Sequence, residues 1–165
     1  MSNLENKLKK IINTFNNINK EDGYRDIKKL SDKYKKNIKV LNVLSQISQK
    51  MGDIDTAINS LKRILLIENN NIDLLTKIYK LFLTKSSFDE ALKNINLILE
   101  IEQNNYEATR DKAYIHFLKK EFAKATKCIE NISKLKDDDY FGYNIKGLIS
   151  LKNNKLDIAK NYFEN

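Results

Sequence analysis

Apolar residues recur along most of this chain with a period of 34 residues. Four alanines mark the period, and the positions three residues before and four residues after each alanine are apolar as well. The three columns are Ile54, Phe88, Phe122 and Leu156; Ala57, Ala91, Ala125 and Ala159; and Leu61, Ile95, Ile129 and Phe163. Spacings of three and four residues place these side chains on one face of a helix. The pattern therefore predicts a chain of repeated helical units.

Each period predicts two helices. The first helices are expected over 38–51, 72–85, 106–119 and 140–152, and the second helices begin near Ile54, Phe88, Phe122 and Leu156. An Asn or Asp precedes each first helix, where its side chain can accept a hydrogen bond from a backbone N–H of the first turn. These residues are Asn37, Asn71, Asn105 and Asp139. The alanine column fits a close crossing of the two helices, since a larger side chain would push them apart.

Two helices in 34 residues, with a small residue at position 8 and alanine at position 20, resemble the tetratricopeptide repeat family. The fourth unit follows the family pattern most fully, with Tyr143, Gly147, Ala159 and Phe163. Three features depart from it: Tyr79 stands at position 8, Lys112 and Lys146 stand at position 7, and the chain contains no proline. The resemblance implies an all-α fold, a right-handed α-solenoid of helical hairpins.

The period also predicts how the chain is divided. Residues 1–37 read as a degenerate N-terminal helical repeat, because Gly23, Ile27 and Leu30 fall in the packing columns. Four repeats follow, of which the last is incomplete: 38–71, 72–105, 106–139 and 140–165. Each repeat buries its apolar face only against its neighbours, so several must stack for stability.

The formal net charge of +8 changes this interpretation little. Residues 1–37 hold ten lysines and arginines against five acidic residues, and each later unit is near neutral. A basic segment can indicate a nucleic acid or an anionic surface as partner. However, the aromatic residues fall mainly in packing columns and are not interleaved with basic residues as stacking platforms would be. Nucleic acid is therefore not the expected partner.

The sequence shows no catalytic, cofactor or metal site. His116 and Cys128 are the single histidine and cysteine and stand twelve residues apart, whereas a metal site needs clustered ligands. The four glycines are isolated, so no phosphate-binding loop is expected. His116 is expected to be structural and Cys128 an inert thiol. The apolar runs are too short to span a bilayer and no secretory signal is evident, so a cytoplasmic protein without a membrane partner is expected.

The resemblance implies where a partner would bind. In tetratricopeptide repeat proteins the first helices line a concave groove that holds a peptide or a helix. The groove positions here are Lys39, Asn42, Gln46, Lys77, Lys80, Arg110, Tyr114, Phe117, Phe141, Asn144 and Leu148. The early members are polar and the later ones include several apolar and aromatic residues. Such a groove suits a peptide that combines acidic residues with apolar anchors.

The apolar end has a second explanation, which is that the fourth unit awaits a further helix, because 140–165 is shorter than the period. Three hypotheses on function follow. The favoured one is a non-catalytic scaffold that binds another protein or peptide. The alternatives are an N-terminal targeting or substrate-recruiting region of a larger, transferase-type enzyme, and a structural adaptor that self-associates through the incomplete C-terminal repeat.

Overall fold

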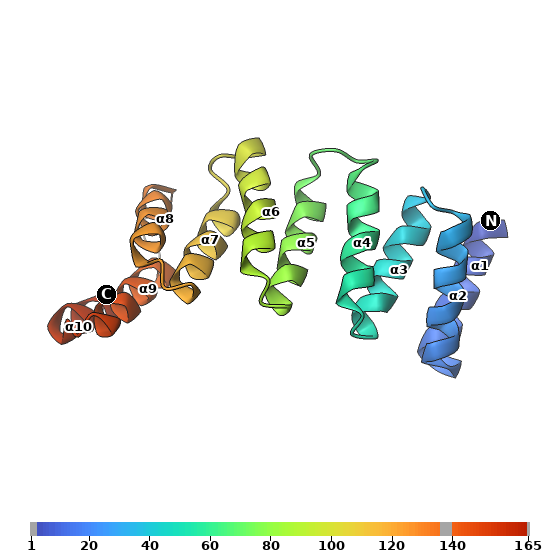
Figure 1. The fold of residues 1–165 in the computed structure, drawn as a ribbon, viewed down its shortest axis with the longest axis horizontal. Coiled ribbons are helices and arrows are strands. Elements are labelled where there is room, and N and C mark those ends of the chain that lie inside the picture. Colours follow the sequence, from blue (N-terminus) through green and yellow to red (C-terminus); the bar gives the residue numbers. More distant parts are fainter. Residues whose placement is uncertain (1–2, 136–139, 165) are drawn as a thin grey trace. The chain divides into compact units, whose positions relative to one another are not determined.

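The computed structural model describes residues 3–135 and 140–164. These residues form ten α-helices and one π-helical turn, and none of them lies in a strand (Figure 1). The chain divides into two compact units, unit 1 (Met1–Ser87) and unit 2 (Phe88–Asn165). Within the described ranges, no helix combines the length and the apolar character needed to cross a membrane.

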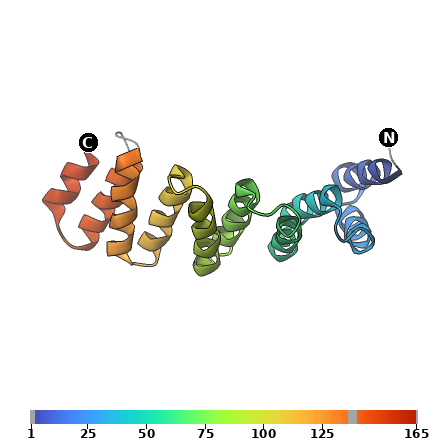
Figure 2. The same ribbon diagram turned by 90° about the horizontal axis from the view of Figure 1, so that it is seen from above.

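In both units each helix packs beside the next along the chain (Figures 1 and 2). Unit 1 contains α1 (Asn3–Asn13), the π-helical turn η1 (Thr14–Ile18), α2 (Lys20–Lys33), α3 (Ile38–Lys50), α4 (Ile54–Leu65) and α5 (Ile72–Thr84). Unit 2 contains α6 (Phe88–Ile101), α7 (Tyr106–Leu118), α8 (Phe122–Leu135), α9 (Tyr140–Lys152) and α10 (Leu156–Phe163). In unit 2, α7 also contacts α9 directly. The predicted all-α solenoid fold is confirmed.

The predicted helix starts are confirmed as well: α3 to α10 begin at the residues that the 34-residue period predicts. The first three of the predicted first helices, α3, α5 and α7, end one residue earlier than expected. The Asx column acts as predicted, because Asn37, Asn71 and Asn105 each accept a hydrogen bond from a backbone N–H in the first helical turn. Asp139 lies outside the described residues.

The alanine column lies at the helix crossings, as its size predicts. Ala57, Ala91 and Ala125 are fully buried, and Ala159 is 1% exposed. The departures from the family pattern are accommodated in two ways. Tyr79 is buried despite its size. Lys112 and Lys146 are half-buried, and each places its ammonium group beside a partner, which lets the aliphatic part of the side chain cover apolar surface.

The partners of these two lysines come from neighbouring helices. Nζ of Lys112 donates a hydrogen bond of 2.7 Å to Oδ1 of Asn96 on α6. Nζ of Lys146 lies 5.9 Å from the ring centroid of Tyr162 on α10. Position 7 can therefore hold a lysine here because a polar or aromatic partner lies within its reach.

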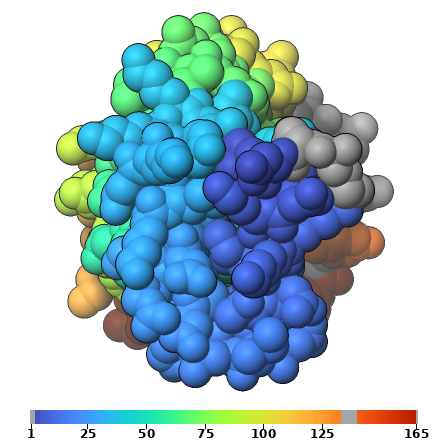
Figure 3. All heavy atoms as spheres, turned by 90° about the vertical axis from the view of Figure 1, so that its right-hand side faces the viewer, coloured from blue at the N-terminus to red at the C-terminus, as the bar shows by residue number. Residues whose placement is uncertain are grey.

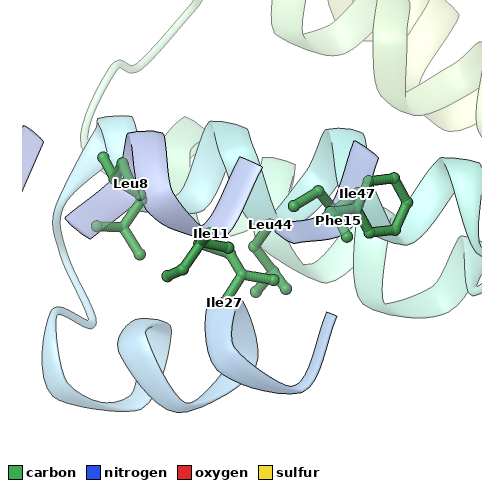
Figure 4. Close-up of a cluster of buried hydrophobic side chains, with 7 residues drawn as sticks. Leu8, Ile11, Phe15, Ile27, Leu44 and Ile47 are labelled. Atoms are coloured by element: carbon green, nitrogen blue, oxygen red, sulfur yellow. The ribbon is translucent and has the colours of Figure 1, made fainter. Parts of the chain in front are cut away.

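The helices α1 and α2, joined by η1, form a helical hairpin over residues 3–33 that joins the core of unit 1. Leu8, Ile11 and Phe15 from α1 and η1 pack against Ile27 of α2 (Figure 4). The same cluster includes Val40, Leu44 and Ile47 of α3. The N-terminal hairpin thus shares one apolar cluster with the first full repeat. Unit 2 has a corresponding cluster built from α7, α8 and α9: Ala113, Ala125, Cys128, Ile129, Ile132, Ile145 and Ile149.

Oppositely charged residues also join neighbouring repeats within each unit. In unit 1, Lys85 pairs with Asp55, and in unit 2, Lys119 pairs with Asp89. Both pairs join residues 30 positions apart, so they occupy the same two places in successive repeats. Exposed pairs of this kind are screened by solvent and contribute little to stability. Their main effect is therefore on how successive repeats align, and their effect on the stability of the chain is small.

The turn between the two helices of each repeat uses a left-handed backbone. Gly52 has a φ of 78°, and the residues one, two and three periods later also have positive φ values: Ser86 with 55°, Lys120 with 61° and Asn154 with 57°. Glycine adopts this conformation without cost, and asparagine tolerates it, whereas most other L-residues are strained there. Ser86 and Lys120 therefore adopt a backbone conformation that serine and lysine do not favour.

Replacing Lys120 by glycine is expected to stabilise unit 2 by about 1 kcal/mol, because the left-handed conformation then costs nothing. The measurement is the free energy of unfolding from chemical denaturation followed by circular dichroism. Lys120→Ala is the matched control, since it removes the same ammonium group but keeps a Cβ, and it should give no such gain. Equal stability of the two variants would contradict a left-handed turn at this position.

Candidate functional site

Three of the predicted groove residues come together in unit 2. Tyr114 of α7 and Phe141 of α9 pack edge to face, with ring centroids 6.5 Å apart and an angle of 65° between the rings. The guanidinium carbon of Arg110, one turn before Tyr114, lies 5.9 Å from the centroid of the Phe141 ring. We call Arg110, Tyr114 and Phe141 the aromatic cluster. The direct contact between α7 and α9 brings these side chains together.

The aromatic cluster is open to a partner. Tyr114 is 43% exposed, and Arg110 and Phe141 are half-buried. Edge-to-face ring pairs and a cation beside a ring are favourable arrangements, worth roughly 0.5–1.5 kcal/mol each. The cluster is therefore held in place before any partner binds, which reduces the entropy lost on binding.

Two carboxylates lie beside the guanidinium of Arg110 and balance its positive charge. Its guanidinium lies 2.9 Å from Oδ1 of Asp111 and 4.0 Å from Oε1 of Glu107. Burial disfavours the charged form, but the hydrogen bond to Asp111 and the negative charge of Asp111 outweigh burial and keep the pKa of Arg110 above its ordinary value. Because the positive charge is already balanced, this part of unit 2 presents aromatic surface rather than net positive charge.

The other predicted residues of unit 2 have different surroundings. Phe117 and Leu148 are half-buried and pack against the core cluster of unit 2. The Phe117 ring also lies 6.0 Å from the ring of Phe122. Asn144 on α9 is exposed. Phe117 and Leu148 thus support the surface from below, while Asn144 can contact a partner.

The predicted residues of unit 1 are polar and more dispersed. Lys39 on α3 forms an ion pair of 2.7 Å with Glu5 of α1, so Glu5 partly neutralises the positive charge of Lys39. On the same helix Asn42 is half-buried and Gln46 is exposed. Lys77 and Lys80 are exposed and lie about one turn apart on α5. These two lysines are the basic pair of the predicted groove.

The partner of His116 could not be identified from the sequence. This histidine is 7% exposed, and its Nδ1 lies 2.7 Å from Oε2 of Glu121 in the turn between α7 and α8. Lys124 Nζ also lies 3.2 Å from the same carboxylate oxygen. The interaction ties the end of α7 to the start of α8, which agrees with the structural role expected for His116. The separation of five residues across a turn gives no recognisable motif.

The hydrogen bond with His116, followed by the contact with Lys124, holds the pKa of Glu121 below its ordinary value of 4.5. The stabilisation from this carboxylate is thus present above pH 4.5 and is lost as the pH falls through the lower pKa of the folded state. We expect Glu121→Gln to be less stable than the unsubstituted chain at neutral pH, and the difference to shrink in acid. Denaturation at a series of pH values measures this, and a difference that grows in acid would contradict it.

Cys128 has the surroundings of an inert thiol. It is 9% exposed within the core cluster of unit 2, and burial raises the pKa of its thiol. A raised pKa keeps the thiol protonated at neutral pH, and the protonated form is a poor nucleophile and a poor metal ligand. In the part of the chain that the structure describes, no three His, Cys, Asp or Glu side chains come together as metal ligands would.

Comparisons with known proteins agree with this architecture. Residues 38–71 match the tetratricopeptide repeat family. Residues 38–71 therefore form a tetratricopeptide repeat. Among solved structures, this repeat protein is similar to MamA, with 18% identity, a TM-score of 0.70, and coverage of 99% of this chain and 92% of MamA. No curated protein sequence matches the chain.

Two further solved structures share the fold of this repeat protein. One is a tetratricopeptide repeat protein from Parabacteroides merdae ATCC 43184, with 16% identity, a TM-score of 0.77, and coverage of 97% of this chain and 64% of that one. The other is MamA, residues 41 to the end, from Desulfovibrio magneticus RS-1, with 14% identity, a TM-score of 0.70, and coverage of 96% and 92%. At sequence identities this low, the similarity shows a shared fold only.

Proposed function

We propose that this repeat protein is a non-catalytic interaction scaffold that binds a peptide or a helix of another protein through the exposed side chains of its first helices. The aromatic cluster carries the proposal. It combines an exposed tyrosine, a phenylalanine and an arginine on two adjacent first helices, α7 and α9. Tyrosine and arginine are among the residues that contribute most to protein interfaces.

The two units contribute different chemistry to this function. In unit 2 an apolar anchor of the partner packs on Tyr114 and Phe141, and Asn144 provides hydrogen bonds beside them. In unit 1 acidic residues of a partner interact with Lys77 and Lys80. Lys39, Asn42 and Gln46 complete the polar set on α3, and Phe117 and Leu148 support the apolar one. The repeats that present these residues are 38–71, 72–105, 106–139 and 140–165.

Peptides selected by display on the purified chain provide the test. Tyr114→Ala is expected to weaken the binding of selected peptides about tenfold, because an exposed aromatic anchor is removed. Arg110→Glu is expected to weaken peptides with apolar anchors, and Lys77→Glu is expected to weaken acidic peptides. Circular dichroism checks that each variant is folded.

Glu130→Ala is the matched control for these variants, because Glu130 is exposed on a second helix, α8. It should leave the affinity of every selected peptide unchanged. Binding that is unaffected by Tyr114→Ala, Arg110→Glu and Lys77→Glu would show that the first helices do not form the binding site.

Self-association is a second candidate function, which exposed apolar residues near the end of unit 2 favour. Leu156 and Phe163, which lie seven residues apart on one face of α10, are 68% and 47% exposed. Apolar residues gathered on one helix are typical of an interaction surface. Light scattering over a range of concentrations tests this candidate. A mass that rises with concentration, and falls back to the monomer with Leu156→Asp, would support it, and a constant monomer mass would exclude it.

A further inference from the structure

A second surface, separate from the aromatic cluster, lies at the N-terminal hairpin. A groove of about 300 Å³ runs between α1 and α2 in unit 1. Figure 3 shows these two helices side by side on the surface of this end of the chain. The residues that line the groove come only from α1 and α2 and from Thr14, the first residue of η1. None of them belongs to the predicted first-helix groove.

Lysines converge on this groove because of their spacing. Lys7 and Lys10 lie three residues apart on α1, and Lys29 and Lys33 lie four residues apart on α2. Residues three or four apart share one face of a helix, so each helix turns a pair of lysines toward the groove. One carboxylate, Asp26, lines the groove with these four ammonium groups. The groove is therefore strongly positive.

The four lysines carry more charge than Asp26, the carboxylate that lines the groove with them, can balance. Among the described residues, no carboxylate lies within ion-pair distance of the four lysines that line the groove. Two nearby acidic residues are engaged elsewhere: Glu5 pairs with Lys39, and Asp22 pairs with Arg25. Four like charges around one groove, with a single carboxylate among them, repel one another, and an anionic ligand would relieve that repulsion.

The floor of the groove is apolar. Ile11 and Leu30 lie between the lysine pairs. Ile11 is 8% exposed and belongs to the core of unit 1, and Leu30 is half-buried against the same core. An apolar floor with a positive rim is complementary to an apolar side chain that has carboxylates on either side.

We propose that the groove between α1 and α2 binds an acidic protein segment in which one aliphatic or aromatic side chain is flanked by glutamate or aspartate. The apolar side chain contacts Ile11 and Leu30, and the carboxylates pair with the lysines of the rim. Among the described residues that line the groove none is aromatic, so they offer no stacking surface of the kind that single-stranded nucleic acids use. A concave groove also fits a single side chain better than it fits a lipid surface.

The test uses a panel of short fluorescein-labelled peptides, each with glutamates around one central Leu, Ile or Phe. Fluorescence anisotropy at about 50 mM salt, where screening is weak, measures their affinity for the full chain. We expect peptides of the panel to bind, and the double variant Lys10→Glu, Lys29→Glu to weaken them at least about tenfold, because it places like charges against the ligand. Peptides with glutamine in place of glutamate, or serine in place of the central residue, should bind more weakly.

The matched control is the double variant Lys20→Glu, Lys36→Glu. It changes the net charge of unit 1 by the same amount at exposed positions that do not line the groove. This control variant should keep most of the affinity for the peptides. If it loses as much affinity as the Lys10→Glu, Lys29→Glu variant, the effect depends only on net charge and the proposal is overturned. Tyr114→Ala should leave this binding unchanged, which separates this proposal from the proposed function of the first helices.

Two further outcomes would overturn the proposal. One is that no peptide of the panel binds. The other is that a single-stranded oligonucleotide or vesicles of phosphatidylcholine with phosphatidylserine bind in a manner that depends on Lys10 and Lys29 while the peptides do not. In either case the positive groove would not be a site for an acidic protein segment.

Discussion

Gly23→Ala is expected to lower the free energy of unfolding by about 2 kcal/mol, although alanine is the better helix former. A Cβ at position 23 would lie 2.6 Å from Cβ of Phe15 and 2.7 Å from its Cα and N. Two of these atoms belong to the backbone of η1, so the clash cannot be relieved by rotating a side chain. Overpacking costs about 3 kcal/mol in such a case, and the helix propensity of alanine returns about 1 kcal/mol.

Gly147→Ala is the matched control for this prediction. A Cβ at position 147 would also be crowded, at 2.5 Å from a carbon of the Phe163 ring. However, Phe163 is 47% exposed, so its ring can rotate toward solvent. We expect this variant to remain within about 1 kcal/mol of the unsubstituted chain. Urea denaturation measures both variants, and equal stabilities would contradict the close approach of η1 to α2.

Ile27→Ala is expected to have the other large effect, a loss of about 2–5 kcal/mol in the free energy of unfolding. Ile27 is fully buried, and its side chain is surrounded by residues of α1, η1 and α3 (Figure 4). Removing its side-chain atoms leaves a cavity among α1, η1, α2 and α3, which costs stability because the surrounding residues collapse into it only in part. The apolar packing between the N-terminal hairpin and the first full repeat is then weakened.

The control for Ile27→Ala removes the same atoms from the surface. Ile18 in η1 is 73% exposed, and Ile18→Ala should change the free energy of unfolding by no more than about 0.5 kcal/mol. Thermal and urea denaturation of the two variants give the comparison. A small effect of Ile27→Ala would show that α2 does not pack into the core of unit 1.

The regular parts of the fold could be predicted because each depends on residues close in sequence. A helix start needs one Asx side chain and its own first turn, as at Asn71, and a buried helix face needs a spacing of three and four residues. The alanine column could be predicted for the same reason, since the period aligns equivalent crossings. These features repeat, and repetition makes the signal stronger than a single helix would give.

Other features depend on contacts that no local pattern encodes. The π-helical turn over Thr14–Ile18 places Phe15 against Gly23, and neither residue alone indicates this. Ser86 and Lys120 adopt a left-handed conformation because the turn geometry of the repeat imposes it, while their residue types do not suggest it. The pairing of His116 with Glu121 likewise follows from how α8 begins.

The residues of the candidate site could be predicted one by one, but their contact with one another could not. The resemblance to the repeat family selected Arg110, Tyr114 and Phe141 separately. Their contact follows from the packing of α7 on α9. The groove between α1 and α2 was not predicted, because the basic excess of residues 1–37 does not reveal which lysines share a face with Leu30.

Site-specific photo-crosslinking tests the central claim, that partners bind to the first helices, most directly. Benzoylphenylalanine is placed at position 114 or 144 on the first helices, or at position 130 on α8, and each folded variant is irradiated in lysate of the native cells. We expect positions 114 and 144 to crosslink to the same protein and position 130 not to crosslink to it. Crosslinking to that protein from position 130 alone, or equally from all three positions, would contradict binding at the first helices.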